Sequence, residues 1–449
     1  MLNKYNIKTR LTFIIPSLLG LLLFITPIHS QGSLTIPIAV ISKALQSLLS
    51  DYLIYIIMSV IVSSAVISII CRFFKIPVIQ NSPFLHTLFN ITPVWFVIRI
   101  LGAVFILLTL FTLGPEAIYS SHTGGLVLHD LLPVLFCVFF FAGMLLPLLL
   151  NFGLLELFGT LFTKIMRPIF NLPGRSAIDC LASWLGDGSV GILLTNKQYE
   201  DKFYTQREAA IIGTTFSAVS ITFSLVVIAQ VGLEHLFVQF YLTVCLAGLV
   251  AAIIVPKLPP LCWKKDIYID GSTPNTDNEL TPVGHSLFSW GIEQALYKAA
   301  HAPSVKKTLI DGLKNAIDMI FGVLPVVMAI GTVALVLAEY TPLFDYLGYP
   351  FIPFLKLLHI PEAELASKTI VVGFADMFLP SILASAIHSD MTRFVIAAMS
   401  VTQLIYMSEI GALLLGSKIP INIAELFIVF ILRTLVTLPV IAGIAHLLF

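Results

Sequence analysis

Two carboxylates stand in segments that are otherwise apolar and rich in helix-breaking residues. Asp187 lies in Gly186-Asp187-Gly188-Ser189, at the middle of the apolar segment 177–194, and Asp376 lies in the segment 366–387. A charged side chain at the centre of a bilayer costs about 2.5–3.5 kcal/mol or more unless it is paired or hydrated. Each acid therefore needs a partner, a proton or a cation, and we expect Asp187, Ser189 and Asp376 to bind a substrate or an ion. The alternative is that either acid lies at a membrane surface and only caps a helix.

Four further polar residues interrupt long apolar runs: Ser217, Gln403, Ser408 and Glu409. Ser217 and Gln403 are 186 residues apart, the spacing of an internal repeat described below. Glu409 follows Arg393 by 16 residues, about 24 Å if the helix is continuous. We expect all four to contribute to the same site, with Glu409 either a proton-coupling acid or a residue at the end of a span. Small hydroxyl side chains also let membrane helices approach closely, which needs no ligand.

The sequence lacks the common motifs of enzymes and metal sites. The five cysteines are scattered, and neither a CxxC pair nor an HExxH motif occurs, so we expect no metal site. No GxxxxGK[ST] loop is present to bind ATP or GTP. Ser189, His388 and Asp376 could be arranged as a hydrolase triad only on paper, because no GxSxG turn accompanies them. We expect no enzyme activity and no cofactor other than H⁺ or Na⁺ as a coupling ion.

The composition places these residues in a membrane. Hydrophobic residues make up 58% of the 449 residues and charged residues 11%, whereas about a quarter of a soluble protein is charged. The 25 basic and 25 acidic residues give no net charge, so no nucleic-acid partner is expected. The expected partners are the lipid bilayer and a small-molecule solute, and a homo-oligomer remains open.

Apolar runs near the ~20 residues needed to cross a bilayer recur along the chain. The nine expected spans are 11–28, 52–70, 94–113, 131–155, 209–231, 236–255, 316–338, 394–415 and 423–448, with a polar loop at 257–311. The first run is either a cleaved signal peptide or a retained helix. Pro16 and Gly20 within it, and the polytopic character of the rest, favour retention.

Lysine and arginine in the connections predict the orientation, because cytoplasmic loops retain them. Lys4, Lys8 and Arg10 precede the first span, whereas residues 114–130 contain neither lysine nor arginine. We therefore expect a multi-pass protein of the inner (cytoplasmic) membrane with its N-terminus in the cytoplasm.

Two parts of the chain resemble each other at a nearly constant offset. Phe158/Phe344, Pro168/Pro353, Pro173/Pro361, Gly186/Gly373 and Arg207/Arg393 are 185–188 residues apart. Each copy reads as a span, an interfacial segment, a broken apolar segment and two further spans. Because three crossings are an odd number, the second copy must enter from the opposite face. We expect an all-α polytopic fold of about nine transmembrane helices, in which 1–130 is an N-terminal three-helix region, 131–256 the first repeat, 257–311 a cytoplasmic loop and 312–449 the inverted second repeat.

Inverted repeats with interrupted helices are typical of secondary transporters, whose sites lie near the bilayer midplane between the repeats. The segments 177–194 and 366–387 are long enough to enter the bilayer, and each carries an acid and helix breakers at its middle. Each is expected to form a re-entrant helical hairpin, whose irregular turn is tolerated where it lines a watery cavity. The alternative for the first is a cytoplasmic loop with a core helix.

The Pro-rich approach, the glycine-containing broken helix and the duplication resemble the nucleoside-recognition (Gate) domain of concentrative nucleoside transporters, ferrous-iron transport proteins and spore-maturation membrane proteins. The opening Leu11-Thr12-Phe13-Ile14-Ile15-Pro16 and the later Thr35-Ile36-Pro37-Ile38-Ala39-Val40 resemble the YjiH-type membrane proteins in particular. The resemblance implies two Gate-like repeats with hairpins at 177–196 and 362–388. The tips differ from those of nucleoside carriers, which have a Gln-Thr-Glu-type sequence in the first hairpin and an Asn-Glu pair in the second.

The sequence thus predicts a secondary transporter of a small polar solute, nucleoside-like or another metabolite, coupled to H⁺ or Na⁺ and working by alternating access of two hairpins. The rival prediction is a non-transport membrane scaffold or assembly protein similar to the spore-maturation Gate proteins.

Overall fold

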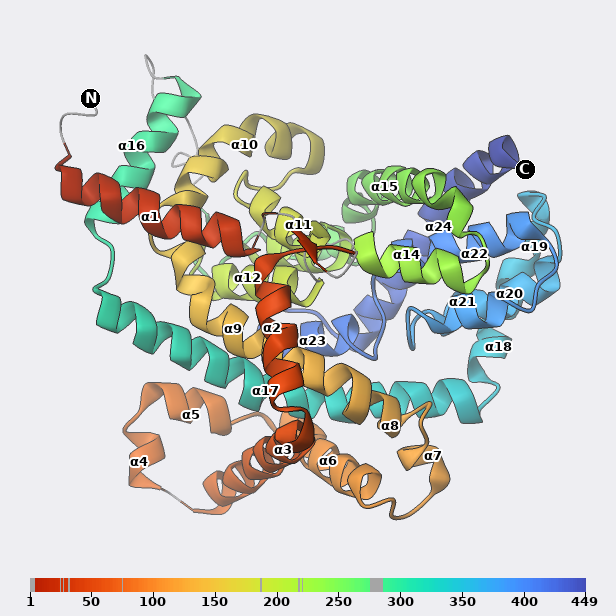
Figure 1. Ribbon diagram of the computed structural model, residues 1–449, viewed down its shortest axis with the longest axis horizontal. Helices are drawn as coiled ribbons and strands as arrows, with labels where there is room; N and C mark the ends of the chain where they lie inside the picture. The colour runs from red at the N-terminus through yellow and green to blue at the C-terminus, as the bar shows by residue number, and fades with distance from the viewer. Residues whose placement is uncertain are drawn as a thin grey trace.

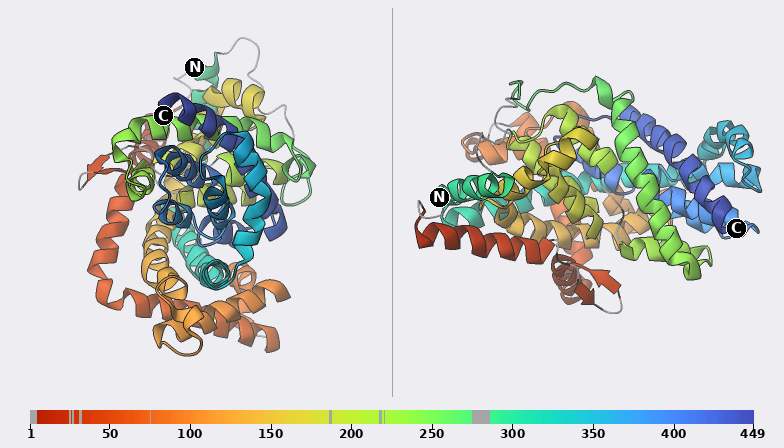
Figure 2. Two further views of the ribbon diagram at one scale, coloured as in Figure 1. Left: turned by 90° about the vertical axis from the view of Figure 1, so that its right-hand side faces the viewer. Right: turned by 90° about the horizontal axis from the view of Figure 1, so that it is seen from above.

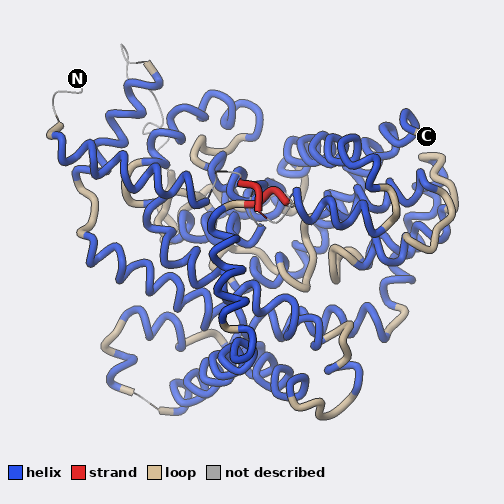
Figure 3. Tube along the Cα trace, viewed as in Figure 1, coloured by secondary structure: helices blue, strands red, loops and turns tan. Residues whose placement is uncertain are grey.

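The computed structural model describes the chain except for residues 1–4, 25, 27, 31–32, 75, 186–187, 217–218, 220 and 275–285. The described residues are mostly helical (Figure 1). A small antiparallel ribbon of β1 (Ile28–Ser30) and β2 (Ser33–Thr35) is the one sheet among them (Figure 3). Seven helices in the described part of the chain are long and apolar enough to cross a membrane. The protein is therefore a predominantly helical, multi-pass membrane protein, as the composition predicted.

The N-terminal region supplies a peripheral layer. Its helices are α1 (Ile7–Phe24), α2 (Pro37–Leu48), α3 (Ser50–Phe73), α4 (Pro77–Gln80), α5 (Pro83–Phe89), α6 (Pro93–Leu110), α7 (Glu116–Tyr119) and α8 (Gly124–Leu126). Helices α3 and α6 pack against each other and against the long helix α17 (Val305–Tyr340), at the bottom of the view in Figure 1. This layer covers one side of the elements that carry the predicted site.

The middle of the chain forms a first series of elements. A π-helical turn (Val127–Leu131) leads into α9 (Leu132–Leu150), which is followed by α10 (Leu154–Phe170), α11 (Ser176–Leu185), α12 (Gly188–Glu200), α13 (Gln206–Ile211), α14 (Ile221–Gln230) and α15 (Phe237–Ile254). Helix α13 starts with a capping box, in which the Thr205 hydroxyl accepts from the Glu208 backbone and the Glu208 carboxylate accepts from the Thr205 N–H.

A second series follows in the same order. After α16 (Leu287–Ala300) and α17 come α18 (Leu343–Gly348), α19 (Ile352–Leu357), α20 (Ala363–Val372), α21 (Leu379–Ala384), α22 (Asp390–Gln403), α23 (Ile410–Gly416) and α24 (Ile423–Leu448). A long helix, a helical linker, a helix pair, an interrupted helix and a final long helix thus occur twice. Helices α15 and α24, which end the two series, pack side by side (Figure 2). The inversion of one series relative to the other stays a prediction.

Two of the nine expected spans are not continuous helices. The span expected at 209–231 consists of α13, a π-helical stretch (Ile212–Phe216) and α14, and the span expected at 394–415 consists of α22 and α23. Leu404, which follows α22, adopts a left-handed conformation with φ 60°, which ends a helix of L-residues. The apolar runs predicted the location of both segments, but hydropathy does not report a break in the backbone.

Proline and serine side chains explain how the long α17 packs. Pro325 lies inside this helix and has no N–H to bond the carbonyl of Phe321. The Ser64 hydroxyl of α3 donates to that carbonyl at 2.7 Å instead. Gly102 of α6 lies so close to Pro325 that a Cβ there would be 2.2 Å from the Pro325 carbonyl oxygen. Close helix contact and full use of the backbone hydrogen bonds fix α17 against the N-terminal layer.

The expected polar loop at 257–311 contains the helix α16, which packs against α10. Ala295, Leu296 and Ala299 on α16 are buried. The charge density of this region suggested only a loop, yet one face of α16 is apolar enough to dock.

Candidate substrate and ion site

The helices α20 and α21 form the second predicted hairpin, and Asp376 stands at its tip. Its Oδ1 accepts hydrogen bonds from the backbone N–H of Phe378 at 2.8 Å and of Leu379 at 3.3 Å. Its Oδ2 accepts from the Ser408 hydroxyl at 2.7 Å. Three donors thus hold this carboxylate, in accordance with the expectation that an acid here needs partners. Asp376 caps the start of α21 and also joins the hairpin to a distant segment.

That distant segment is the break between α22 and α23, residues 404–409. The backbone N–H of Met407 donates to the Phe374 carbonyl at 2.7 Å, and that of Ser408 donates to the Ala375 carbonyl at 2.9 Å. The break therefore pairs with the hairpin tip through backbone as well as side-chain bonds. On its other side, Gly331 of α17 lies near the break, since a Cβ there would be 3.2 Å from the Ser408 carbonyl oxygen. The break is consequently enclosed by the hairpin and α17.

A cavity of about 310 Å³, which we call the tip cavity, lies beside these groups. Asp376, Glu409 and Asp130 supply its carboxyl groups, and the Tyr406 hydroxyl donates to Glu409 Oε2 at 3.2 Å. The remaining lining residues are mainly apolar, and among them are Gly188, Val219, Phe223, Phe378, Leu404 and Ile410. A mostly apolar cavity with a few polar groups at fixed positions is the usual form of a small-molecule site.

The helices α11 and α12 form the first predicted hairpin, and a buried acid joins its two arms. Asp179 on α11 is 1% exposed. It accepts from the Thr195 hydroxyl at 2.9 Å, the Gln198 amide at 2.6 Å and the Tyr204 hydroxyl at 3.0 Å. Because Thr195 and Gln198 belong to α12, Asp179 fixes the arms at the base of the hairpin.

The glycines of this hairpin permit close approach. A Cβ at Gly191 would lie 2.6 Å from the Ser183 Cβ on the opposite arm, so only glycine allows the two arms this spacing. A Cβ at Gly188 would lie 3.0 Å from Ile410 Cδ1. The start of α12 therefore packs directly on the start of α23.

At the other end of α12 and α23 lies a second cavity of about 280 Å³, which we call the base cavity. It adjoins a further space of about 530 Å³ that shares several of its residues. The polar lining of the base cavity includes Thr87, Arg99, Asn196, Lys197, Glu200, Asn315, Asp318 and Lys418. Cations and carboxylates are mixed in this lining, in contrast to the acids of the tip cavity.

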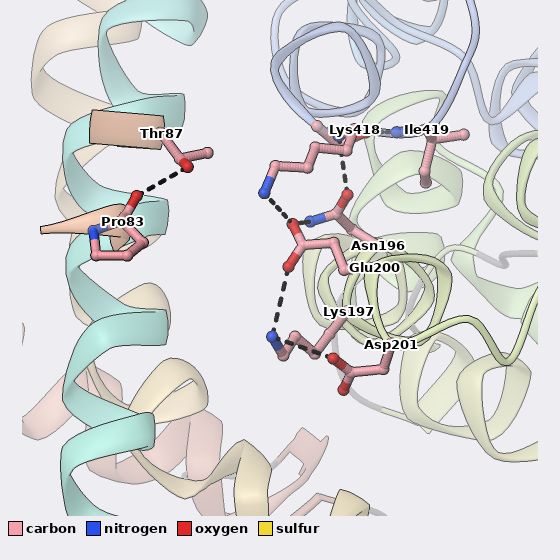
Figure 4. A network of polar contacts seen from close by, with 9 residues as sticks. Pro83, Thr87, Asn196, Lys197, Glu200, Asp201, Lys418 and Ile419 are labelled. Atoms are coloured by element: carbon pink, nitrogen blue, oxygen red, sulfur yellow. Dashed lines mark hydrogen bonds and ion pairs between the residues drawn. The ribbon is translucent and has the colours of Figure 1, made fainter. Parts of the chain in front are cut away.

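A polar network lies along one wall of the base cavity (Figure 4). Lys418 Nζ is 3.1 Å from Glu200 Oε1, and the Lys418 N–H donates to Asn196 Oδ1 at 2.9 Å. Glu200 Oε2 also pairs with Lys197 at 3.4 Å, and Lys197 is 3.5 Å from Asp201. These contacts join the end of α12 to the segment after α23, opposite Thr87 on α5.

The two cavities lie at opposite ends of the contact between α12 and α23. Gly188 and Ile410 line the tip cavity, whereas Asn196 and Gly416 line the base cavity. Eight residues of helix from Gly188 to Asn196 span about 12 Å. The packed contact between α12 and α23, which includes Ile410 against Gly188, lies between the two cavities.

Gln403 ends α22 and holds two other elements. Its amide Nε2 donates to the Ile370 carbonyl of α20 at 3.0 Å and to the Thr434 hydroxyl of α24 at 2.9 Å. A Cβ at Gly373 would lie 2.2 Å from Gln403 Oε1. Gly373 has an ordinary helical φ of −57°, so its role is to admit this amide and not to bend the chain.

The structure brings together some of the predicted residues and separates others. Asp376 and Ser408 are bonded, and Asp376 and Glu409 line the same cavity. Gln403 lies away from that cavity lining, between α20 and α24. Ser189 is buried at the second position of α12, and Asp187 and Ser217 are outside the described residues. The expected helical depth of Glu409 is wrong, because α22 ends six residues before it.

Several residues at these sites were missed by the sequence analysis. Asp179 was hidden in a short amphipathic stretch, and no sequence spacing connects it with Tyr204. Arg433, at the middle of α24, is 1% exposed, and a basic residue halfway along an apolar span of 26 residues is a signal that the sequence did contain. Arg99 is different, because its place inside the span 94–113 already marks it in the sequence as a buried charge; it donates to the Ser68 hydroxyl at 3.2 Å.

Comparison with known proteins agrees with the Gate resemblance. The family model for nucleoside recognition, Gate, matches residues 132–234, from α9 to the end of α14 and the turn after it. An uncharacterized protein of Alkalihalophilus pseudofirmus is 50% identical over 440 residues, which are 98% of this chain and 95% of that protein.

Two solved structures of CNTnw, a concentrative nucleoside transporter, align with most of the chain at low similarity. A doubly substituted form in an outward-facing state is 15% identical with a TM-score of 0.36, over 99% of this chain and 93% of that one. An inward-facing substrate-bound state is 14% identical with a TM-score of 0.36, over 91% of this chain and 97% of that one.

The apolar helices and the matched domain define a multi-pass membrane protein with a nucleoside-recognition (Gate) domain. With half of its residues identical over nearly the full length, the chain belongs to the same family as the Alkalihalophilus pseudofirmus protein.

Proposed function

We propose that this protein is a secondary transporter of a small polar solute, nucleoside-like or another metabolite, driven by a gradient of H⁺ or Na⁺. The observation that carries the proposal is the pair of cavities at opposite ends of the α12–α23 contact, one of them bounded by the tip of hairpin α20–α21. A carrier needs a site that each side of the membrane can reach in turn. Two separate cavities on either side of the packed α12–α23 contact support this reading over a scaffold with dry hairpins.

The solute would bind between the tip cavity and the start of α12. Asp376 and Glu409 offer carboxylate acceptors to hydroxyl, amine or amide donors, and the apolar walls accommodate a ring or chain. The charged network of the base cavity would line the route on the other side. In the membrane we place the N-terminus in the cytoplasm, as the distribution of lysine and arginine favours.

Uptake into proteoliposomes tests the proposal. Purified protein would be reconstituted and supplied with labelled nucleosides, amino acids and dipeptides under an imposed H⁺ or Na⁺ gradient. We expect accumulation of at least one class under one gradient, and liposomes with Asp376→Asn protein serve as the matched control. No uptake of any class under either gradient would contradict the proposal and favour the scaffold.

A disulfide lock tests the role of the α12–α23 contact. Gly188→Cys and Ile410→Cys would be introduced together after replacement of the five native cysteines by serine. We expect oxidation to abolish uptake and a reductant to restore it, because the crosslink holds the two cavities apart. Each single-cysteine variant controls for the substitution itself, and undiminished uptake by the oxidised double variant would exclude this contact as a gate.

A further inference from the structure

The two interrupted helices of the protein meet at one buried cation. Arg433 extends from the middle of α24 and is 1% exposed. Its Nε and Nη2 donate to the Thr402 carbonyl of α22 at 3.0 and 2.8 Å. Its Nη1 donates to the Thr215 carbonyl at 3.1 Å and lies 3.5 Å from that of Thr214.

These carbonyls stand at the ends of the two half-helices that precede the breaks. Thr402 is the next-to-last residue of α22, and Thr214 and Thr215 lie in the π-helical stretch that extends α13. The last four carbonyls of a helix have no partner within it, and each C-terminal end carries a charge of about −0.5. Two such ends therefore balance one guanidinium charge.

Arg433 makes no ion pair with a carboxylate within the described part of the chain. A buried charge is stable only when it is paired or fully hydrogen-bonded, so the backbone carbonyls are its counter-charge. Adjacent Thr434 holds Gln403 and, through it, α20. One turn of α24 consequently joins both breaks and the second hairpin.

In secondary transporters, unwound backbone carbonyls and the C-terminal ends of half-helices coordinate Na⁺. We infer that Arg433 is a built-in cation that takes the place of Na⁺ at the paired helix breaks, so that the coupling ion is a proton acting at the acids of the tip cavity. The acids concerned are those that line that cavity, Asp376, Glu409 and Asp130. The choice of coupling ion rests on the proposed transport function, whereas the structural role of Arg433 does not.

Thermal unfolding of the purified protein without solute tests the role of Arg433. Midpoints would be compared in about 200 mM NaCl and in choline chloride at equal ionic strength, because a ligand of the native state raises the midpoint. We expect no Na⁺-specific rise in the wild type. Arg433→Ala should lower the midpoint by roughly 5 °C or more, and Na⁺ or about 10 mM guanidinium should recover part of the loss.

Arg99→Ala is the matched control, since Arg99 is also buried in a span but donates to a hydroxyl. We expect its midpoint to show no recovery specific to Na⁺. Arg433→Lys keeps the charge, so its unfolding midpoint should lie between those of the wild type and Arg433→Ala. This variant tests the inference if the alanine variant cannot be purified. A Na⁺-specific rise in the wild type, or an unchanged midpoint for Arg433→Ala, would overturn the inference.

Uptake measurements in proteoliposomes distinguish a failure of this inference from a failure of the proposed transport function. Accumulation driven by a proton gradient with no response to Na⁺ supports it, and accumulation driven by Na⁺ alone overturns proton coupling. Absence of any uptake, with the expected unfolding results, would leave Arg433 as the cation of the breaks in a protein that does not transport.

Discussion

The two hairpins are built from similar elements but are held in different ways. In hairpin α11–α12 the buried Asp179 joins one arm to the other near the base. In hairpin α20–α21 the bonds to distant segments run outward, from Asp376 to Ser408 at the tip and from the Glu362 carboxylate to the Ser389 N–H at the base. The first hairpin is therefore clamped internally by a buried acid, although the end of α12 also bonds to the segment after α23, whereas the tip of the second hairpin is fastened to the interrupted helix α22–α23. Any movement of the second hairpin must carry or release that helix.

Asp179→Ala should give the largest effect on stability. The substitution leaves the Thr195, Gln198 and Tyr204 donors buried without their acceptor, and each unsatisfied group costs about 1–3 kcal/mol. We expect a loss of about 3 kcal/mol or more, measured as a lower unfolding midpoint in detergent. Asp201→Ala, just beyond the end of the opposite arm α12 and exposed, is the control and should change stability by less than about 1 kcal/mol. Equal midpoints for the two variants would show that the base of the first hairpin is not clamped.

Asp376→Asn should affect transport more than folding. The amide removes the charge that accepts from Ser408 and two backbone N–H groups, each such charged bond contributing about 1.5–3 kcal/mol. Because the Asp376 side chain is half-buried, water can supply some of the hydrogen bonds that are lost. We expect uptake to fall about tenfold or more, as a bond worth 1.4 kcal/mol corresponds to a factor of ten, while the midpoint changes less than for Asp179→Ala. A lower unfolding midpoint for Asp376→Asn than for Asp179→Ala would show that the second hairpin, and not the first, depends more on its acid for stability.

Gly373→Ala tests the close approach of Gln403 to the second hairpin. The added methyl would meet the Gln403 side-chain oxygen, and overpacking of this kind costs about 1–3 kcal/mol. Combining it with Gln403→Ala removes the clash, so the double variant should be less destabilised than the sum of the single variants. Strictly additive midpoints would argue that the two residues are not in contact.

Lys418→Ala should have the smallest effect. Its ion pair with Glu200 is partly exposed, and such pairs contribute about 0.2–1 kcal/mol. We expect a change in midpoint within that range that disappears at high salt. A large loss of uptake that salt does not reduce would instead give the base-cavity network a direct part in solute passage.

The sequence predicted a helical membrane protein and the positions of most of its helices, because hydropathy and charge are properties of single segments. Asp376 was found for the same reason, since an acid between apolar segments is costly wherever its partners lie. Its partner Ser408 was predicted as a site residue but not as a contact, because residues 32 positions apart meet only through the tertiary fold. The non-helical Val219 and the end of α22 at Gln403 were missed because hydropathy averages over a break. Arg433 could have been found by the criterion that identified Asp376.

Helix α17 has 36 residues and is therefore about 54 Å long, well beyond the ~30 Å of a bilayer core. Its first turns carry Lys306, Lys307 and Asp311, whereas Gly331, near the other end, lies against the break at Ser408. Pro325 interrupts its backbone hydrogen bonds between these two ends. The helix therefore links its charged first turns to the break beside the second hairpin over a length that a bilayer core accommodates only by tilt, bending or protrusion.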